Sequence, residues 1–253
     1  LGYFDDSNGE EKIWNGINYG LSPSLDIEIF HALRKELTAP CQGATLRLCG
    51  FTQSGEPKSG KVILQKFINL HGKKVLVNLT LTQASASPYF LQNKGDLASR
   101  QAFLTQQSEE NFFQGLKTAD VLFYNGHSRN GGGPDFAPPV LDSTNHVNYK
   151  GYYKVKRAGI QKTIAAMKQN LHQQPLVGLF SCYSRSHFYK TFMRLNPNQA
   201  LILSADTINY FDSMKASVGY LEGILRGTCS QELADTAKQE AQIKTGFQGY
   251  NIK

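Results

Sequence analysis

The stretch LFYNGHSRNGGG, residues 122–133, begins as an apolar strand and ends in a glycine-rich loop that carries His127. Short apolar runs bounded by turn residues are typical of strands buried in a sheet. Two interpretations of the loop follow from this pattern. Either it is a flexible turn, or its glycines clear space for a substrate beside a histidine that takes part in the chemistry.

Strands and helices alternate on both sides of this stretch. Apolar strands separated by amphipathic helices favour an α/β fold, with a mostly parallel sheet covered on both faces. The pattern predicts strands at 120–125, 175–180 and 200–205, and helices over 108–118 (with Ser108 as N-cap), 159–171, 187–195 and 212–226, with a long loop up to about residue 157.

The N-terminal part has a different rhythm. After an irregular lead-in over residues 1–25, the pattern predicts a helix over 26–37 capped by Ser24. Three strand-like runs separated by turn residues then predict a meander, at 44–51, 61–68 and 74–82. We therefore expect a strand-rich N-terminal extension over 1–73 and an α/β/α domain over 74–253.

Composition narrows the function classes. The chain has 253 residues, a hydrophobic content of 40% and a formal net charge of +7. It holds no apolar run of the ~18 residues that a membrane span needs. The basic and aromatic stretch KGYYKVKR (150–157) is typical of nucleic-acid binding. No groove-reading motif accompanies it, so we expect no nucleic-acid partner.

Four cysteines are too few for a fold built on disulfides. Cys41 and Cys49 lie eight positions apart across a turn-like segment, so they are either bridged or two reduced structural thiols. A bridge would favour a secreted or periplasmic protein, and reduced thiols would suit the cytoplasm. No CxxC pair occurs, so we expect no zinc site built on thiolates and no metal.

The carboxyl ends of parallel strands meet at one edge of a sheet, where ligands bind in such folds. His127 follows the strand at 120–125, and Cys182 follows the strand at 175–180. A thiol attacks as the thiolate, and an imidazole within reach can take its proton and later give it to a leaving group. The two residues therefore predict a nucleophile and a general acid/base.

Two apolar strands, one ending in NGHS (125–128) and the next in FSCYS (180–184), resemble the caspase-like cysteine peptidases. That group, clan CD, includes caspases, gingipains, legumains, clostripain and separase. The resemblance covers about residues 74–226. It implies a three-layer α/β/α sandwich and an endopeptidase that cuts a peptide or protein substrate without a cofactor.

Carried over residue by residue, the resemblance makes Cys182 the nucleophile and His127 the general acid/base. The amides of Ser128 and Cys182 form the oxyanion hole, and Asp206, Ser181 and Gly126 line the substrate pocket. Asp206 would select Lys or Arg, which makes Lys156 and Arg157 a candidate self-processing site. Position 128 is Ser where the family usually has Gly, and Tyr183-Ser184 replaces the Arg-Gly of caspases.

Other interpretations stay open beside the peptidase. A caspase-like domain that binds or regulates without cutting is the main alternative, and Ser128 is its best support. GEPKSGKV (55–62) matches a phosphate-binding loop, although Val62 stands where Ser or Thr is needed. His127, His146 and His187 lack the spacing of a helical zinc site. The glycosylation pattern NLT (78–80) falls inside an expected strand.

Overall fold

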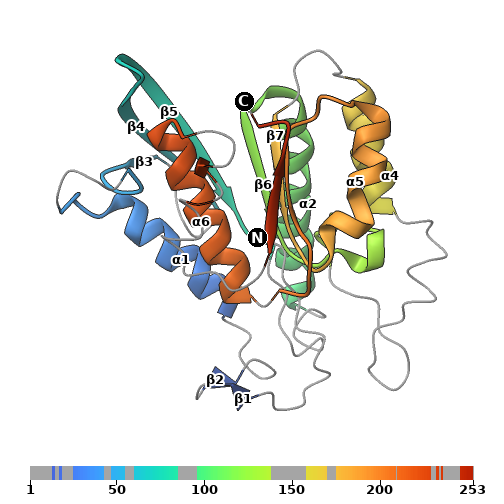
Figure 1. The fold of residues 1–253 in the computed structure, drawn as a ribbon. Helices are drawn as coiled ribbons and strands as arrows, with labels where there is room; N and C mark the ends of the chain where they lie inside the picture. The colour runs from blue at the N-terminus through green and yellow to red at the C-terminus, as the bar shows by residue number, and fades with distance from the viewer. Residues whose placement is uncertain are drawn as a thin grey trace.

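The computed structural model of the chain describes residues 13–14, 17–18, 25–42, 47–54, 60–84, 96–137, 158–169, 175–208, 210–228, 232–233, 235 and 246–252. Together they form a mixed α/β structure (Figure 1). The elements are, in chain order, β1 (Ile13–Trp14), β2 (Ile17–Asn18), α1 (Leu25–Thr38), β3 (Thr52–Ser54), β4 (Lys61–Leu70), β5 (Lys73–Thr82), α2 (Asp96–Thr118), β6 (Val121–Asn125), η3 (Arg129–Gly131), α4 (Ala158–Lys168), β7 (Leu176–Phe180), α5 (Ser184–Leu195), β8 (Leu201–Ser204), α6 (Tyr210–Arg226) and β9 (Phe247–Tyr250).

One sheet has the strand order β6-β7-β8-β9. The first three strands are parallel, as their sequence pattern predicts, and β9 joins β8 in the antiparallel sense. The sheet is therefore mixed rather than purely parallel. Strand β9 was not expected, because its sequence FQGY is short, half polar and contains a glycine.

Helices cover both faces of this sheet. Successive side chains of a strand point to opposite sides, so each strand contributes side chains to a cluster on each face. On one face Leu122 and Leu179 join a cluster with residues of α2, α4 and α5. On the other face Phe180 and Ile202 pack against Tyr220 of α6. The nearly complete burial of β7 and the complete burial of β8 explain why their sequences are continuously apolar.

A second, antiparallel sheet has the order β3-β4-β5. Its inner face packs on α1 and α6 in a separate cluster that includes Phe30, Leu64 and Leu225. Helix α6 consequently lies between the two sheets (Figure 1). Strands β4 and β5 pair along their whole length. The domain boundary expected between residues 73 and 74 falls within this hairpin, at the start of β5. That division into two parts stays a prediction.

Two expectations about single elements are wrong. Of the first strand expected at 44–51, the described residues 47–51 are not in a strand: residues 47–49 form a bend, and the strand of the meander is β3, Thr52–Ser54. The N–H groups of Arg47 and Leu48 bind the carboxylate of Glu222 and so are not available to a strand ladder. The second concerns Ser108, which is buried in the middle of α2 rather than at its N-cap.

The other helices predicted over 26–37, 159–171, 187–195 and 212–226 correspond to α1, α4, α5 and α6. Ser24 lies outside the described residues. Within the described part of the chain, no helix combines the length and apolar composition that crossing a bilayer requires.

Candidate active site

The ends of β6 and β7 lie side by side. In their parallel register Asn125 is the partner of Phe180, and the N–H of Gly126 donates to the carbonyl of Phe180 at 3.3 Å. His127 is two residues beyond Asn125, and Cys182 is two residues beyond Phe180. The structure therefore brings the two predicted catalytic residues to the same edge of the sheet, beyond neighbouring strands.

Cys182 occupies the turn between β7 and α5. It is half-buried and is a free thiol, and its Sγ donates to the carbonyl of Ile208 at 3.4 Å. Tyr183 follows in the left-handed region (φ 51°) as the N-cap of α5. This sharp strand-to-helix turn places the thiol directly before the helix N-terminus, where partial positive charge collects.

The segment after β8 holds this turn in place. The N–H of Tyr183 donates to the carbonyl of Asp206 at 2.9 Å, and the Oγ of Ser204 donates to the same carbonyl at 2.7 Å. The N–H of Ser204 also donates to the Oγ of buried Ser184 at 2.8 Å. Two of these hydrogen bonds join the segments and the other, from Ser204 to Asp206, lies at the end of β8, so the Asp206 backbone has a fixed position beside Cys182, while the residue itself is exposed.

His127 is half-buried at the start of the glycine-rich loop. The carbonyls of His127 and Asp135 share the one hydroxyl proton of Tyr124, each at 3.0 Å from the hydroxyl oxygen. Burial raises the pKa of Tyr124 well above its usual value, so the hydroxyl remains a donor at physiological pH. Tyr124 thereby ties both ends of the loop to the sheet.

The loop requires its glycines at a close approach. A Cβ on Gly133 would stand 2.9 Å from the carbonyl oxygen of His127. Arg129, Asn130 and Gly131 all have positive φ, which gives the loop a tight reversal as η3. Arg129 is only 5% exposed, and η3 contacts α5. The described start of the loop, residues 126–137, is therefore packed against the rest of the structure.

A buried polar bridge, not expected from the sequence, ties the strand ends to α6. The single hydroxyl proton of Ser213 is shared between the Oδ1 of Asn125, 2.9 Å from Oγ, and the carbonyl of Phe180, at 3.0 Å. Ser213 is fully buried and Asn125 is 6% exposed. The one sequence feature that could have indicated this bridge is the asparagine at the end of a buried strand, because a buried side-chain amide needs a hydrogen-bond partner.

The remaining predicted pocket residues are close to the strand ends. Gly126 and Ser181 are both buried, and the Oγ of Ser181 has no hydrogen-bond partner. Lys156 and Arg157, the candidate processing site, fall outside the described residues, as does His146. His187 lies on α5 and not on either strand end.

Cys41 and Cys49 form a disulfide, with a Cα–Cα distance of 5.1 Å. The loop they close is held by two charged side chains on other elements, the buried Glu222 and the partly exposed Lys66. Glu222 of α6, 2% exposed, accepts the N–H groups of Arg47 and Leu48 at 2.9 Å. Lys66 donates to the carbonyl of Cys49 at 2.6 Å, and desolvation lowers the pKa of Lys66.

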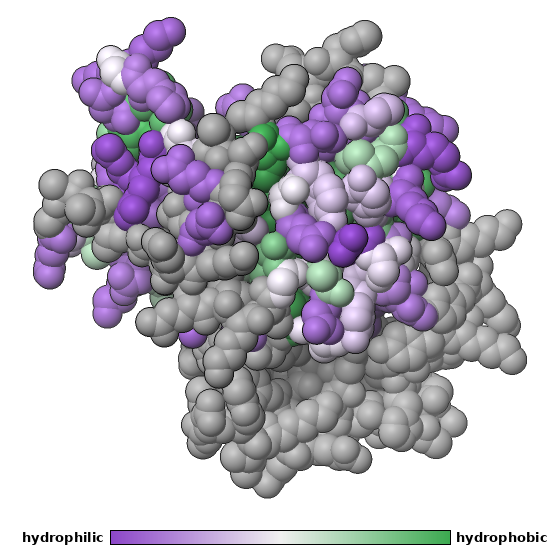
Figure 2. Space-filling view, in the orientation of Figure 1, coloured by the Kyte–Doolittle hydropathy of each residue, from purple (hydrophilic) through white to green (hydrophobic). Residues whose placement is uncertain are grey.

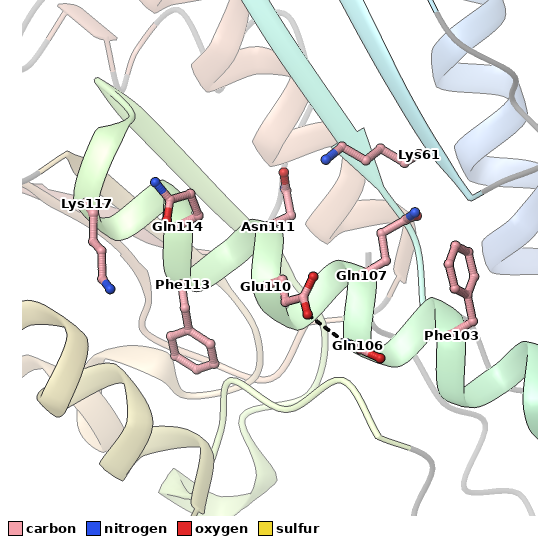
Figure 3. A pocket seen from close by; sticks show the side chains of 9 residues that line it. All are labelled: Lys61, Phe103, Gln106, Gln107, Glu110, Asn111, Phe113, Gln114 and Lys117. Atoms are coloured by element: carbon pink, nitrogen blue, oxygen red, sulfur yellow. Dashed lines mark hydrogen bonds between the residues drawn. The ribbon is translucent and has the colours of Figure 1, made fainter.

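A hollow of about 660 Å³ runs along α2, apart from His127 and Cys182 (Figure 3). Its lining is mostly amide and charged side chains, and Gln106 donates to Glu110 across one helical turn at 2.8 Å. Phe113 and Lys117 lie on a different side of α2 from Lys61 (Figure 3). Because the side chains do not converge on one point, this hollow is not the candidate site.

Neither of the two ligand sites that the sequence raised as alternatives gains support. In the described residues, no three His, Cys, Asp or Glu side chains are grouped so that they could hold a metal ion. Gly60 and Lys61 lead into strand β4. A phosphate-binding loop instead needs a helix N-terminus after the Gly-Lys pair. Asn78 lies within β5, as expected from the sequence.

Comparisons of the chain with protein-family models, curated proteins and solved structures found no match.

Proposed function

We propose that the chain is a cysteine endopeptidase with a caspase-like, three-layer α/β/α domain. The observation that carries the proposal is the register of β6 and β7, with Asn125 opposite Phe180. Neighbouring strands in a sheet are ~4.8 Å apart, so residues just beyond paired ends start from nearby positions. His127 and Cys182 are in those positions, with η3 and α5 in contact behind them.

The proposed reaction has two steps. The Cys182 proton passes to His127 while Sγ bonds to the carbonyl carbon of the substrate, and the carbonyl electron pair moves to oxygen. The tetrahedral intermediate then collapses to a thioester, and the amine leaves with the proton from His127. Water, losing a proton to His127, next displaces Sγ; the carboxylic acid leaves and the proton returns to Cys182.

The developing oxyanion needs donors that are already in place. In this proposal they are the amides of Ser128 and Cys182, at the ends of the two paired strands. The N-terminus of α5 adds partial positive charge on the same side. Ser128 is buried, and its N–H shares a peptide unit with the His127 carbonyl, which accepts from the Tyr124 hydroxyl, so the orientation of that peptide is held from the sheet.

Substrate choice and location are part of the proposal. The exposed carboxylate of Asp206, whose backbone is fixed beside Cys182, would favour Lys or Arg before the cut bond. Lys156 and Arg157 would then be a self-processing site. The Cys41–Cys49 bridge supports a secreted or periplasmic protein, since disulfides persist in oxidising compartments.

A binding or regulatory domain that no longer cuts is the second candidate, and one observation favours it. The Cys182 thiol donates to the carbonyl of Ile208, on the β8 side of β7, whereas His127 follows β6 on the other side. In an active enzyme the thiol must leave this carbonyl and turn toward the imidazole when substrate binds.

Covalent labelling distinguishes the two candidates. A peptidyl electrophile ending in Lys or Arg should modify Cys182 in a Cys229→Ser background, with the modified residue identified by mass spectrometry. Cys182→Ala should abolish labelling, and His127→Ala should slow it by about a hundredfold or more, since general acid/base groups contribute about 10²–10⁴-fold.

His187→Ala, which alters a histidine on α5, is the matched control and should label at the wild-type rate. Failure of Cys182 to react with peptides of varied sequence, in a protein that is folded by circular dichroism, would contradict the peptidase proposal and favour the binding domain.

A further inference from the structure

The outer face of the β4–β5 hairpin exposes apolar side chains that lie together. Among the described residues five large hydrophobic side chains are exposed, and three of them are on this face: Ile63 (38%), Phe67 (58%) and Leu76 (43%). Phe67 and Leu76 are direct cross-strand partners, and Ile63 is two outward positions along the same strand from Phe67. Single exposed apolar residues are ordinary, whereas a cluster on one face indicates an interaction surface.

The opposite face of the hairpin explains why these side chains remain outside. Val62, Leu64 and Ile68 alternate with them and are buried against α1 and α6. The strict alternation leaves no register in which both sets are covered. We call the exposed residues Ile63, Gln65, Phe67, Leu76, Asn78 and Thr80 the hairpin face.

The charge of the hairpin has one sign. Residues 57–95 contain no Asp or Glu. Lys73 and Lys74 are exposed beside the hairpin turn, and the Nζ of Lys74 lies 4.6 Å from the centroid of the Phe67 ring. In Figure 2 the end of the hairpin, at the upper left, is hydrophilic with hydrophobic residues directly beside it. A cationic end that adjoins an apolar face is complementary to an anionic surface with an apolar interior.

We propose that the hairpin face binds an anionic phospholipid surface, with Phe67, Leu76 and Ile63 entering the headgroup region and Lys73 and Lys74 contacting acidic headgroups. Aromatic and aliphatic side chains beside lysines are typical of proteins that lie on a membrane. The long stem of a lysine lets its charge stay at the headgroups while the neighbouring ring is buried.

A second copy of the chain fits this face less well. Two hairpin faces packed together would bring lysines of both copies into one interface that offers no carboxylate from residues 57–95. The centre of the face is the neutral pair Gln65–Asn78, hydrogen-bonded at 2.7 Å. Three apolar side chains also make a smaller dry centre than protein interfaces usually have, whereas a lipid surface needs no shape complementarity.

The inference is independent of the proposed catalysis. Its test is co-sedimentation of the full chain with vesicles of phosphatidylcholine and phosphatidylserine, compared with vesicles of phosphatidylcholine alone. Binding is expected only to the anionic vesicles and should weaken as salt is added. Phe67→Ser and the double substitution Lys73→Glu/Lys74→Glu should each weaken binding at least about tenfold.

Each control makes the same type of substitution at a surface position outside the hairpin face. Phe103→Ser alters another exposed phenylalanine, on α2, and Lys190→Glu alters an exposed lysine on α5; both should bind as wild type. All substituted side chains are at the surface, so folding should be retained and is checked by circular dichroism. Equal binding by all variants, no binding to anionic vesicles, or a dimer that Phe67→Ser dissociates would each overturn the proposal.

Discussion

Ser213 and Asn125, 88 residues apart in the chain, share a hydrogen bond of 2.9 Å that is buried between α6 and the end of β6. The same Ser213 hydroxyl reaches the carbonyl of Phe180 at the end of β7. One side chain therefore links both strand ends from which His127 and Cys182 extend.

Substitution Ser213→Ala should destabilise the protein. It leaves the Oδ1 of Asn125 buried without this donor, at a cost of about 1–3 kcal/mol in the free energy of unfolding. Urea denaturation followed by circular dichroism measures the change. Ser217→Ala is the control: Ser217 is also buried on α6, but its hydroxyl bonds only to Met214 within the helix, and its loss should matter less. Equal effects of the two would contradict the bridge.

Glu222→Gln should cost about 2–4 kcal/mol of stability. The Glu222 carboxylate is buried, accepts two backbone N–H groups of the disulfide loop and pairs with Arg226. Removing its charge leaves the half-buried guanidinium of Arg226 without a counter-charge. Glu109→Gln breaks an exposed pair with Lys162 and should cost less than about 1 kcal/mol. Chemical denaturation of both variants measures the two losses in free energy of unfolding. Equal losses would contradict the expected contribution of the buried Glu222–Arg226 pair.

Removing the disulfide with Cys41→Ser/Cys49→Ser should lower the free energy of unfolding by about 2–3 kcal/mol, the loss expected for a short closed loop. Since the loop is also held by Glu222 and Lys66, the native structure should persist at room temperature. Thermal unfolding with and without reductant gives the measurement. The variant should show no further response to reductant, and a continued response would point to a different bond.

Gly159→Ala should be severely destabilising. Its Cβ would stand 2.0 Å from the carbonyl oxygen of Pro134, so α4 would have to move away from the glycine-rich loop. Gly246→Ala is the matched control, because its Cβ would meet only Ala205 at 3.8 Å. We expect a loss above about 2 kcal/mol for the first and below about 0.5 kcal/mol for the second. Thermal melting that ranks them otherwise would show that the loop yields easily.

Alkaline pH should unfold the protein partly through Tyr220. Burial, with a smaller contribution from Asp235, raises the pKa of Tyr220 from 10.0 to about 12. A raised pKa in the folded state means that the stabilisation is complete below pH 10 and is lost between pH 10 and 12, by about 2 kcal/mol for this group. Denaturation across this window should show a shallower decline for Tyr220→Phe than for wild type, and equal declines would contradict this role of Tyr220.

Much of the sheet could be predicted because its strands are short, apolar and separated by clear turns. The strands at 120–125, 175–180 and 200–205 became β6, β7 and β8 within a residue at each end. Their parallel order then placed His127 and Cys182 at one edge, which is a consequence of topology and needs no side-chain detail.

Other features depend on distant contacts and could not be predicted. Helix α2 begins at Asp96, and its buried stripe Leu104, Ser108, Phe112 and Leu116 passes through the serine that looked like a cap. Strand β3 begins after Phe51 because a carboxylate 174 residues away binds the preceding backbone. The Ser213 bridge likewise joins positions that no local pattern connects.

Helix α6 has a hydrophobic cluster on each of two sides, and among residues 212–226 only Lys215 is exposed. A saturation mutagenesis screen should therefore find intolerance at nearly every position of this helix, with Lys215 as the exception, in place of the alternating tolerance that an amphipathic surface helix gives. Fluorophores, affinity tags and crosslinkers for later experiments belong elsewhere on the chain.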